Sequence, residues 1–335
     1  MKENRRKCVS ARLACAALAL LLAGLASAAD APAKEGIETL RVRPDFYLIA
    51  GAGGNIGVQV GPDGTLLVDT GSLAAADDVI AAIKKITDQP IRFILNTNAD
   101  ADHASANGRL SKAGQSIFNV GANANGIAQA MTNGGGASIL GPDAVLRRLS
   151  ARSASGTAFP SETWPTEAFF EKRKAIYFNK EGIEILRMPT AHTDADSVIF
   201  FRRSDVVMAG DVLDTTRYPV IDVARGGGIN GEIDALNKMI ELAIPPGPFI
   251  YQEGGTYVIA GHGRVCSQFD VVEYRDMVVI IRDNIEGMIR AGMTLDQIKA
   301  ANPTKAYDRE YGASSGAWTT NNFVEAVYKS LTAKK

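Results

Sequence analysis

Apolar and polar positions alternate along the chain in a way that predicts short strands separated by helices. Apolar runs typical of strands occur at 37–43, 45–50, 56–60, 65–68, 91–95, 116–120, 175–178, 183–188, 198–201, 205–208 and 257–260. Helices are expected at 75–87, 104–112, 123–131, 232–242, 269–290 and 321–331. Each half of the chain contains strands and then helices, a pattern that suits two packed sheets flanked by helices. The predicted fold class is therefore α/β.

The first residues differ in character from the rest of the chain. A basic segment at 2–12 precedes an apolar run at 13–25, and Ala26-Ser27-Ala28 fits a cleavage site of small residues. The apolar run is shorter than a typical transmembrane helix. We therefore expect residues 1–28 to be a signal peptide for export to the periplasm or the medium, and residues 29–335 to form a single domain without a membrane span. The Arg5-Arg6 pair leaves twin-arginine export as one alternative, and an uncleaved anchor is another.

The composition is that of a globular protein large enough for a substantial core. The chain has 335 residues, of which 46% are hydrophobic and 22% are charged. Its formal net charge is −1, so no basic field favours a nucleic-acid partner. Cleavage after Ala28 would leave Cys266 as the only cysteine, which excludes an intramolecular disulfide. We expect the Cys266 side chain to be buried packing.

The chain contains three histidines, and each follows closely on a predicted strand. These are His103, His192 and His262, and Asp211 follows another strand between the last two. A single histidine at such a place is more often a hydrogen-bonded loop or core residue. Three of them at strand ends, each beside small or acidic residues, favour one shared metal site, because ligands must converge on one point.

Short polar side chains are dense just after the predicted strand at 91–95. Asn98, Asp100 and Asp102 stand at alternate positions, and His103 follows directly. Their oxygen and nitrogen atoms are potential metal ligands. This segment is therefore the predicted centre of the site.

Four other features are interpreted as structural. Asp69, at an earlier strand end, is expected to fix its loop. The glycine-rich segment 51–55 is expected to be a hairpin turn, because a strand follows it where a phosphate-binding loop would need a helix. The basic segment 145–155 is interpreted as solvated surface. Glycines in the loop 218–231 indicate mobility or a close backbone approach.

Several motifs resemble those of the metallo-β-lactamase-fold hydrolase superfamily. Thr97-Asn98-Ala99-Asp100-Ala101-Asp102-His103 is similar to the family's Thr-His-x-His-x-Asp-His run. Further segments match the family's other signatures: Val68-Asp69-Thr70-Gly71, Ala191-His192-Thr193, Gly210-Asp211 and Gly261-His262-Gly263. The resemblance covers nearly the whole chain after residue 28. It implies a four-layer αβ/βα sandwich with the metal site at one edge of the sheets.

The resemblance also implies which residues bind metal, and the chain departs from the family at two of them. Asp102, His103 and His262 match the residues that hold the second metal, and Asp211 matches the residue that bridges both. The first site keeps His192. Asn98 and Asp100 stand where the family has two histidines, and they are the weaker metal ligands of this set. We expect one Zn²⁺ ion; a second ion would be bound more weakly or be a harder one, such as iron or manganese.

The resemblance implies a metal-dependent hydrolase that cleaves an amide, lactam, ester or similar bond of a small molecule. The candidate catalytic residues are Asp100, Asp102 and His192, and Asp100 is a candidate general base beside the metal. One alternative is a catalytically impaired member that binds a ligand or partner. A third interpretation, an oxygenase, is disfavoured because such members depend on the missing histidines.

The loop after Asp211 supplies candidates for substrate binding. These are Arg217, Tyr218 and Asn230, with Arg225 as a further arginine. An arginine can hold a substrate carboxylate through two parallel hydrogen bonds, although a surface salt bridge is an equally good interpretation.

Overall fold

The computed structural model describes residues 36–116, 135–151, 158–247 and 254–333. The predicted signal peptide, the predicted helix at 123–131 and all but the first residue of the predicted strand at 116–120 lie outside these ranges. Among the described residues, the helices are too short or too polar to span a membrane.

The first half of the chain forms a seven-stranded sheet whose strands follow the order of the sequence. Its strands are β1 (Glu38–Arg43), β2 (Phe46–Ala50), β3 (Ile56–Gly61), β4 (Gly64–Val68), β5 (Ile91–Leu95), β6 (Ser138–Pro142) and β7 (Glu167–Phe169). Strands β1 to β4 form an antiparallel meander, whereas β4 to β7 pair in parallel. Parallel pairing needs crossover connections. Short helices lie in them: α2 (Ala76–Ile86), α3 (Ala101–Ala104), α4 (Asn107–Ala113) and α6 (Asp143–Ser150).

The second half forms a six-stranded sheet in the order β13-β12-β11-β10-β9-β8. Its strands are β8 (Arg173–Phe178), β9 (Glu181–Met188), β10 (Asp196–Phe201), β11 (Val206–Asp214), β12 (Tyr257–His262) and β13 (Val265–Cys266). Only β11 and β12 pair in parallel, across the helix α7 (Ile229–Leu242). The remaining helices follow β13: α8 (Gln268–Arg290), α9 (Leu295–Ala301), α10 (Asp308–Tyr311) and α11 (Thr320–Thr332).

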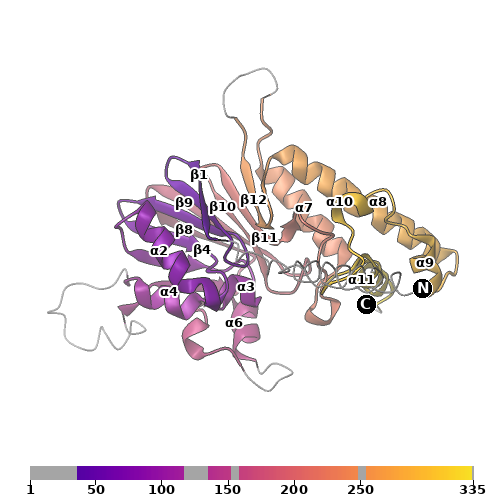
Figure 1. The fold of residues 1–335 in the computed structure, drawn as a ribbon, viewed down its shortest axis with the longest axis horizontal. Helices are drawn as coiled ribbons and strands as arrows, with labels where there is room; N and C mark the ends of the chain where they lie inside the picture. Colours follow the sequence, from indigo (N-terminus) through magenta and orange to yellow (C-terminus); the bar gives the residue numbers. More distant parts are fainter. Residues whose placement is uncertain (1–35, 117–134, 152–157, 248–253, 334–335) are drawn as a thin grey trace, which may run out of the picture. The chain divides into compact units, whose positions relative to one another are not determined.

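The two sheets pack face to face, and helices cover both outer faces (Figure 1). Between the sheets, Phe46 and Leu66 of the first sheet share a buried cluster with Ile199 and Met208 of the second. On the outside of the first sheet, residues of α2 and α4 join a separate buried cluster. On the outside of the second sheet, α7, α8 and α11 do the same. The predicted α/β sandwich with four layers is confirmed.

Local sequence explains how the helices begin and which faces they bury. Ser267 caps α8 and forms a capping box with Asp270. The prediction that 145–155 is solvated surface was wrong for its first part, because α6 extends to Ser150. Val145 and Leu149 lie one turn apart on α6, and both are buried. The arginines between them obscured this apolar stripe in the sequence pattern.

Candidate metal centre

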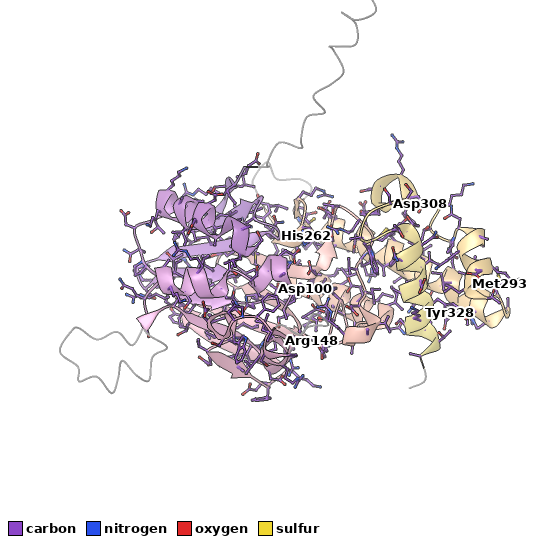
Figure 2. All side chains as sticks on the ribbon, turned by 60° about the horizontal axis from the view of Figure 1, so that its bottom comes forward. Asp100, Arg148, His262, Met293, Asp308 and Tyr328 are labelled. Atoms are coloured by element: carbon purple, nitrogen blue, oxygen red, sulfur yellow. The ribbon has the colours of Figure 1, made fainter. Side chains whose placement is uncertain are left out.

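The predicted ligands meet at one edge of the two sheets, where strand ends of both sheets converge. The segment after β5 supplies Asp100, which stands just before α3, and Asp102 and His103 within α3, and the loop between β9 and β10 supplies His192. Figure 2 shows Asp100 and His262 where the first sheet meets the second, away from Met293 and Tyr328 in the helical layer. The sequence placed these residues at strand ends, and the fold brings those ends together.

His103 is held by carboxylates on both ring nitrogens. Its Nδ1 lies 2.9 Å from Asp69 Oδ2, and its Nε2 lies 3.0 Å from Asp211 Oδ1. Asp69 also accepts hydrogen bonds from the backbone N–H and the hydroxyl of Thr97. The expectation that Asp69 fixes its loop is therefore confirmed, and it orients His103 as well. Gly54 packs against the imidazole so closely that a Cβ atom would lie 2.6 Å from Cε1.

Asp211 is aimed at the site by an irregularity in its strand. The sequence predicted that the strand ends before Asp211, whereas β11 continues to Asp214. The pairing of β11 with β12 shifts register at Gly210, which has a φ of 54°. A Cβ atom at Gly210 would lie 2.6 Å from Cβ of Thr97, so glycine is needed for this close approach.

Asp102, His103, His262 and Asp211 surround one point. His262 Nε2 lies 3.2 Å from Asp102 Oδ2 and 3.3 Å from Asp211 Oδ1. Asp102, His103 and His262 each offer a ligand atom within 4.8 Å of the others. Two imidazoles and two carboxylates make a donor set that zinc accepts. These residues therefore fit a divalent cation.

The electrostatics of this group also suit a cation. Burial alone would lower the pKa of His103, but the charges of Asp211 and Asp69 outweigh it and raise that pKa well above its usual value. Burial is likewise outweighed at His262, where hydrogen bonds to Asp102 and Asp211 raise the pKa to about 9. Burial would raise the pKa of Asp211, but His103 holds it well below its usual range. The carboxylates thus attract positive charge, in the form of protons or of a metal ion.

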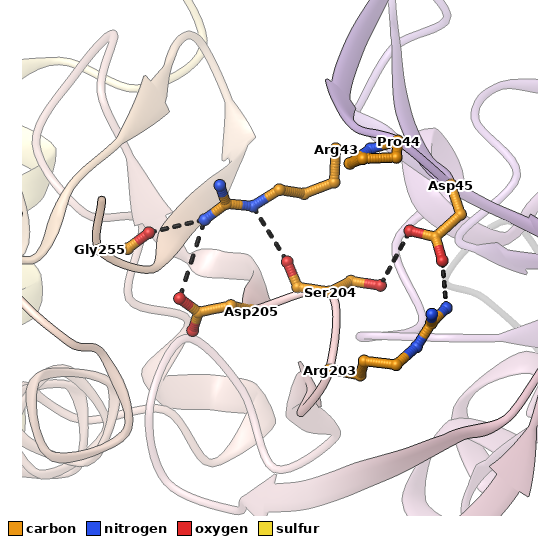
Figure 3. A pocket seen from close by; sticks show the side chains of 7 residues that line it. All are labelled: Arg43, Pro44, Asp45, Arg203, Ser204, Asp205 and Gly255. Carbon is orange, nitrogen blue, oxygen red and sulfur yellow. Dashed lines mark hydrogen bonds and ion pairs between the residues drawn. The ribbon is translucent and has the colours of Figure 1, made fainter. Parts of the chain in front are cut away.

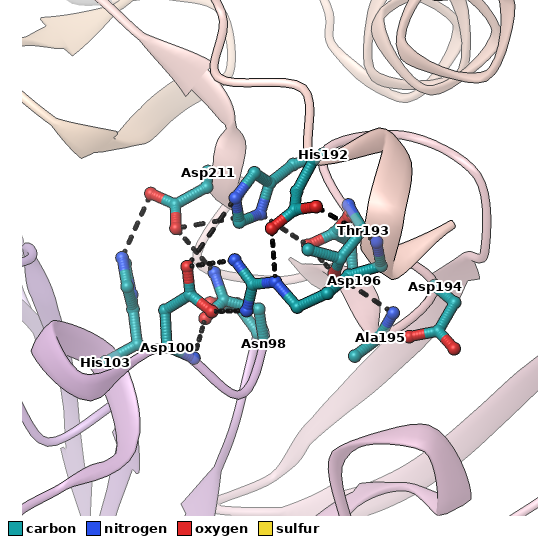
Figure 4. A network of polar contacts seen from close by, with 12 residues as sticks. Asn98, Asp100, His103, His192, Thr193, Asp194, Ala195, Asp196 and Asp211 are labelled. Carbon is teal, nitrogen blue, oxygen red and sulfur yellow. Dashed lines mark hydrogen bonds and ion pairs between the residues drawn. The ribbon is translucent and has the colours of Figure 1, made fainter. Parts of the chain in front are cut away.

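A second group lies beside the first and consists of Asp100, His192 and Asp211 (Figure 4). His192 Nε2 lies 3.6 Å from Asp100 Oδ2, and Nδ1 lies 3.2 Å from Asp196 Oδ1. Asn98 donates an amide N–H to Asp211 Oδ2 at 2.8 Å, and its oxygen accepts the backbone N–H of Asp100 at 2.9 Å. With the amide assigned in this way, Asn98 turns a donor, and not a ligand oxygen, towards the group.

Arg225 occupies part of this second group. Its Nη1 donates to Asp100 Oδ1, and its Nη2 donates to Asp100 Oδ2 at 3.1 Å. Its Nε donates to Asp222 Oδ2 at 2.6 Å. The hydrogen bonds to Asp100, together with the charges of Asp100 and Asp222, outweigh burial and raise the pKa of Arg225 above its usual value.

Comparison with known proteins decides the family. Residues 50–245 match the family model of the metallo-beta-lactamase superfamily. The chain belongs to this superfamily. No curated protein matches the sequence significantly.

Several solved structures resemble this metallo-beta-lactamase superfamily member in fold. The stereoselective inverting sec-alkylsulfatase Pisa1 from Pseudomonas sp. superposes with a TM-score of 0.57 at 14% identity, over 88% of this chain and 50% of that one. A double mutant of that alkylsulfatase gives a TM-score of 0.60 at 12% identity, with the same coverage. The DIM-1 metallo-beta-lactamase gives 0.51 at 13% identity, over 72% of this chain and 97% of that one. The chain spans about half the length of the alkylsulfatase, and these likenesses show the fold.

The cleft of this superfamily member opens over both groups of candidate ligands and has a volume of about 160 Å³. Arg217 lines it and forms an ion pair with Asp214 at 2.7 Å. Tyr218 does not line the cleft. Its ring is buried against Phe323, and its hydroxyl donates to the carbonyl oxygen of Thr304 at 3.1 Å, so its position does not support the predicted substrate contact.

Asn230 also lies outside the residues that line the cleft. It stands in the first turn of α7, and its amide oxygen accepts a hydrogen bond from Arg282 at 2.8 Å. Tyr218 thus faces the core, and Asn230 faces Arg282 of α8. Cys266 is buried, as predicted, and burial raises the pKa of its thiol to about 11.

A larger hollow of about 360 Å³ lies at the opposite end of the strands (Figure 3). The turns before β2 and β11 line it. Arg43 donates to the carbonyl oxygens of Ser204 and Gly255, and Asp45 pairs with Arg203. Because its charged groups satisfy one another, we place the chemistry at the histidine cleft.

Sequence reasoning missed two carboxylates that support the site. Asp196 lies four residues after His192, and it accepts the backbone N–H of Thr193 as well as facing the imidazole. Asp222 holds Arg225. The position of Asp196, four residues after a histidine, is a signal that the sequence did offer. Arg225, in contrast, lies 125 residues from its partner Asp100, a relationship that no local pattern reveals.

Proposed function

We propose that this protein is a metal-dependent hydrolase that holds a divalent cation, Zn²⁺ or an ion of similar character, on Asp102, His103, Asp211 and His262. One observation carries the proposal. A single carboxylate oxygen, Oδ1 of Asp211, lies within 3.3 Å of the Nε2 atoms of both His103 and His262. Two imidazole nitrogens aimed at one shared anionic oxygen, with Asp102 beside them, form a donor set with the residue types of zinc sites.

Other residues of the chain orient the proposed metal ligands and line the space for a substrate. A divalent cation bound here would polarise a substrate oxygen and lower the pKa of a water molecule to about 7. Asp69 fixes the ring of His103 from behind, and Asp196 does the same for His192. His192 stands on the other side of Asp211 from His103, where it lines the cleft. Both oxygens of Asp100 accept hydrogen bonds from Arg225, which argues against the predicted role of Asp100 as general base and favours His192 for proton transfer.

The proposed substrate is a small molecule with an anionic or strongly polar group. Arg217 lies in the cleft wall with its side chain about two-fifths exposed, which suits contact with a carboxylate or sulfate. The fold neighbours are described as a sec-alkylsulfatase and as beta-lactamases. Lactams, carboxylic esters, thioesters and sulfate esters are therefore the classes to test first.

We also propose that residues 1–28 direct export to the periplasm or the medium and that residues 29–335 form the single hydrolase domain. The basic, apolar and small-residue segments of the first 28 residues support this proposal. Mass spectrometry of the protein recovered from a bacterial periplasm tests it. A protein that begins at Ala29 is expected; one that retains Met1 and sediments with membranes contradicts it.

A protein that binds a ligand or partner without turnover is the second candidate. The observation in its favour is the ion pair of Arg225 with Asp100, which engages a carboxylate of the second group. Replacing Asn98 and Asp100 together by histidine distinguishes the two functions. An inert protein that gains hydrolysis through Asn98→His with Asp100→His favours the binding function, whereas turnover by the unaltered protein favours the hydrolase.

The test of the hydrolase is metal-dependent turnover. The purified protein is stripped with a chelator, reloaded with Zn²⁺, Mn²⁺ or Fe²⁺, and assayed on the four substrate classes. We expect hydrolysis of at least one class that is lost on chelation and is absent in His262→Ala. Failure to bind as much as half an equivalent of any of the three metals, with no hydrolysis, overturns the proposal.

A further inference from the structure

We propose that the guanidinium of Arg225 takes the place of a second metal ion, so that this protein binds a single ion. The inference rests on the metal site of the proposed function but concerns the neighbouring group of Asp100, His192 and Asp211. That group has the residue types of a metal site, with ligand atoms within 4.8 Å of one another. A cation supplied by the chain already lies against it.

The contact between Arg225 and Asp100 has the geometry of a strong, specific ion pair. The two Nη atoms donate to the two carboxylate oxygens in parallel, and Nε donates to Asp222. Paired N–H···O bonds of this kind fix both the distance and the plane of the two groups. Both oxygens of Asp100 are thus engaged by the guanidinium, and a metal ion would have to displace it.

The backbone around Arg225 is fixed as firmly as its side chain. Its N–H donates to the carbonyl oxygen of Asp222 at 3.0 Å, and its carbonyl oxygen accepts from Arg148 Nη2 at 2.6 Å and from the N–H of Asp194 at 2.9 Å. Figure 2 shows Arg148 on the same side of the molecule as Asp100. These hydrogen bonds preorganise the guanidinium, which therefore lacks the rotational freedom of an ordinary surface arginine.

The loop of Arg225 also docks directly on the loop of His192. The N–H of Asp222 donates to the carbonyl oxygen of His192 at 2.9 Å. A Cβ atom at Gly227 would lie only 2.1 Å from that same oxygen, so the close approach requires glycine. Arg225 and His192 are thus placed together by one backbone contact.

The ligands left over are too few for a second ion. The amide of Asn98 turns its NH2 group to Asp211 Oδ2 and its oxygen to the backbone N–H of Asp100, so it presents no oxygen to the group. With Asp100 held by Arg225, only His192 and Asp211 remain, whereas zinc sites in proteins use three or four protein ligands. A divalent ion would also be repelled by the guanidinium.

The first group differs in this respect. Within the described part of the chain, Asp102 and Asp211 form ion pairs with histidines only, which lose their protons when metal binds. Arg217, which lines the cleft, pairs with Asp214. The group of Asp102, His103, Asp211 and His262 is therefore free to bind a metal ion. In the second group the guanidinium of Arg225 already occupies Asp100.

Counting bound metal tests the inference without any need for turnover. The stripped protein is titrated with Zn²⁺ by calorimetry, and the bound metal is counted by mass spectrometry after removal of excess ion. The unaltered protein is expected to bind one equivalent. Arg225→Met frees Asp100 and is expected to bind two equivalents. The dissociation constant of its second ion should be at least tenfold lower than that of any second ion bound by the unaltered protein. Arg217→Met, which removes a positive charge from the wall of the cleft, is the matched control and is expected to bind one.

Each result has a defined meaning. Two tight equivalents in the unaltered protein, or a single equivalent in a folded Arg225→Met, overturn the inference and leave the proposed hydrolase standing. No bound metal in the unaltered protein overturns the proposed hydrolase itself. If circular dichroism shows that Arg225→Met does not fold, Arg225→Gln replaces it, because glutamine is neutral yet keeps a donor for Asp222. The same two-equivalent result is expected for it, and a single equivalent in the folded variant overturns the inference.

Discussion

Nδ1 of His103 lies 2.9 Å from Oδ2 of Asp69, and both side chains are almost completely buried. Asp69 stands at the end of β4 with a φ of 62°, a conformation that asparagine also tolerates. Asp69→Asn should therefore keep the backbone but lose the carboxylate that orients His103. We expect metal affinity to fall by about 10- to 100-fold, measured by competition with a chromogenic chelator.

Asp205→Asn is the control for this change. Asp205 has a similar φ of 55°, but it stands at the far end of the second sheet. Its replacement should leave the metal affinity unaltered. Equal affinities for the unaltered protein and Asp69→Asn would contradict the orienting role of Asp69.

The stability of the metal-free protein should fall as the pH rises from about 6.5 to about 9. The carboxylates raise the pKa of His262 to about 9, and that of His103 is raised as well. A histidine with a raised pKa in the folded state stabilises it fully below the unfolded pKa of about 6.5, and this contribution disappears as the pH passes the folded pKa. For His262 the contribution amounts to at most about 3 kcal/mol.

Thermal unfolding at pH 6, 7.5 and 9 measures this trend. In the Zn²⁺-loaded protein the melting temperature should instead be lower at pH 6 than at pH 7.5, because protons compete with the metal for the same histidine nitrogens. A melting temperature of the chelator-treated protein that stays constant or rises across this pH range would count against the charge arrangement described for His103 and His262.

Two glycines should respond in opposite ways to alanine. At Gly227 a Cβ atom would lie 2.1 Å from the carbonyl oxygen of His192. We expect Gly227→Ala to destabilise the fold by about 1–3 kcal/mol, as overpacking does, and to weaken metal binding. At Gly287, in α8, a Cβ atom meets nothing within 4 Å, so Gly287→Ala should stabilise by about 0.5–1 kcal/mol. Denaturant unfolding compares the two, and equal effects would contradict the close approach at Gly227.

Glu232 in α7 is buried, and its replacement should stabilise the protein. Neither carboxyl oxygen has a hydrogen-bond partner among the residues that the structure describes. Burial, together with the charges of Asp196 and Asp211, raises the pKa of Glu232 well above its usual value, so the folded state disfavours its charged form. The unfolded chain ionises it above a pH of about 4.5, and the folded state therefore loses stability relative to the unfolded chain as the pH rises.

Glu232→Met removes this loss and also the cost of an unsatisfied buried polar group, which is about 1–3 kcal/mol. The advantage of the variant should grow with pH by up to about 1.4 kcal/mol per pH unit. Urea unfolding of both proteins at pH 5 and pH 8 measures it. A variant that is less stable than the unaltered protein at pH 8 would show that Glu232 has a partner of structural importance.

The sequence alone predicted most elements of the fold and the candidate metal ligands to test. Strand 91–95 and helix 269–290 were predicted to within one residue, because a buried strand and a long amphipathic helix carry their pattern in consecutive residues. The histidines were recognised because each stands next to a strand end. Their association with Asp211 required only that these ends meet at one edge.

The tertiary structure alone decided which residues surround the three histidines and Asp211. Arg225 appeared in the sequence as a loop arginine, and only the docking of its loop on His192 places it on Asp100. Tyr218 was predicted at the substrate, but the chain turns it into the core against Phe323. A side chain's partner far away in the sequence leaves no local pattern, because charge pairing and burial depend on where the backbone carries each residue. The sequence therefore predicted which atoms can bind a metal, and the fold decided which of them a fixed positive charge already holds.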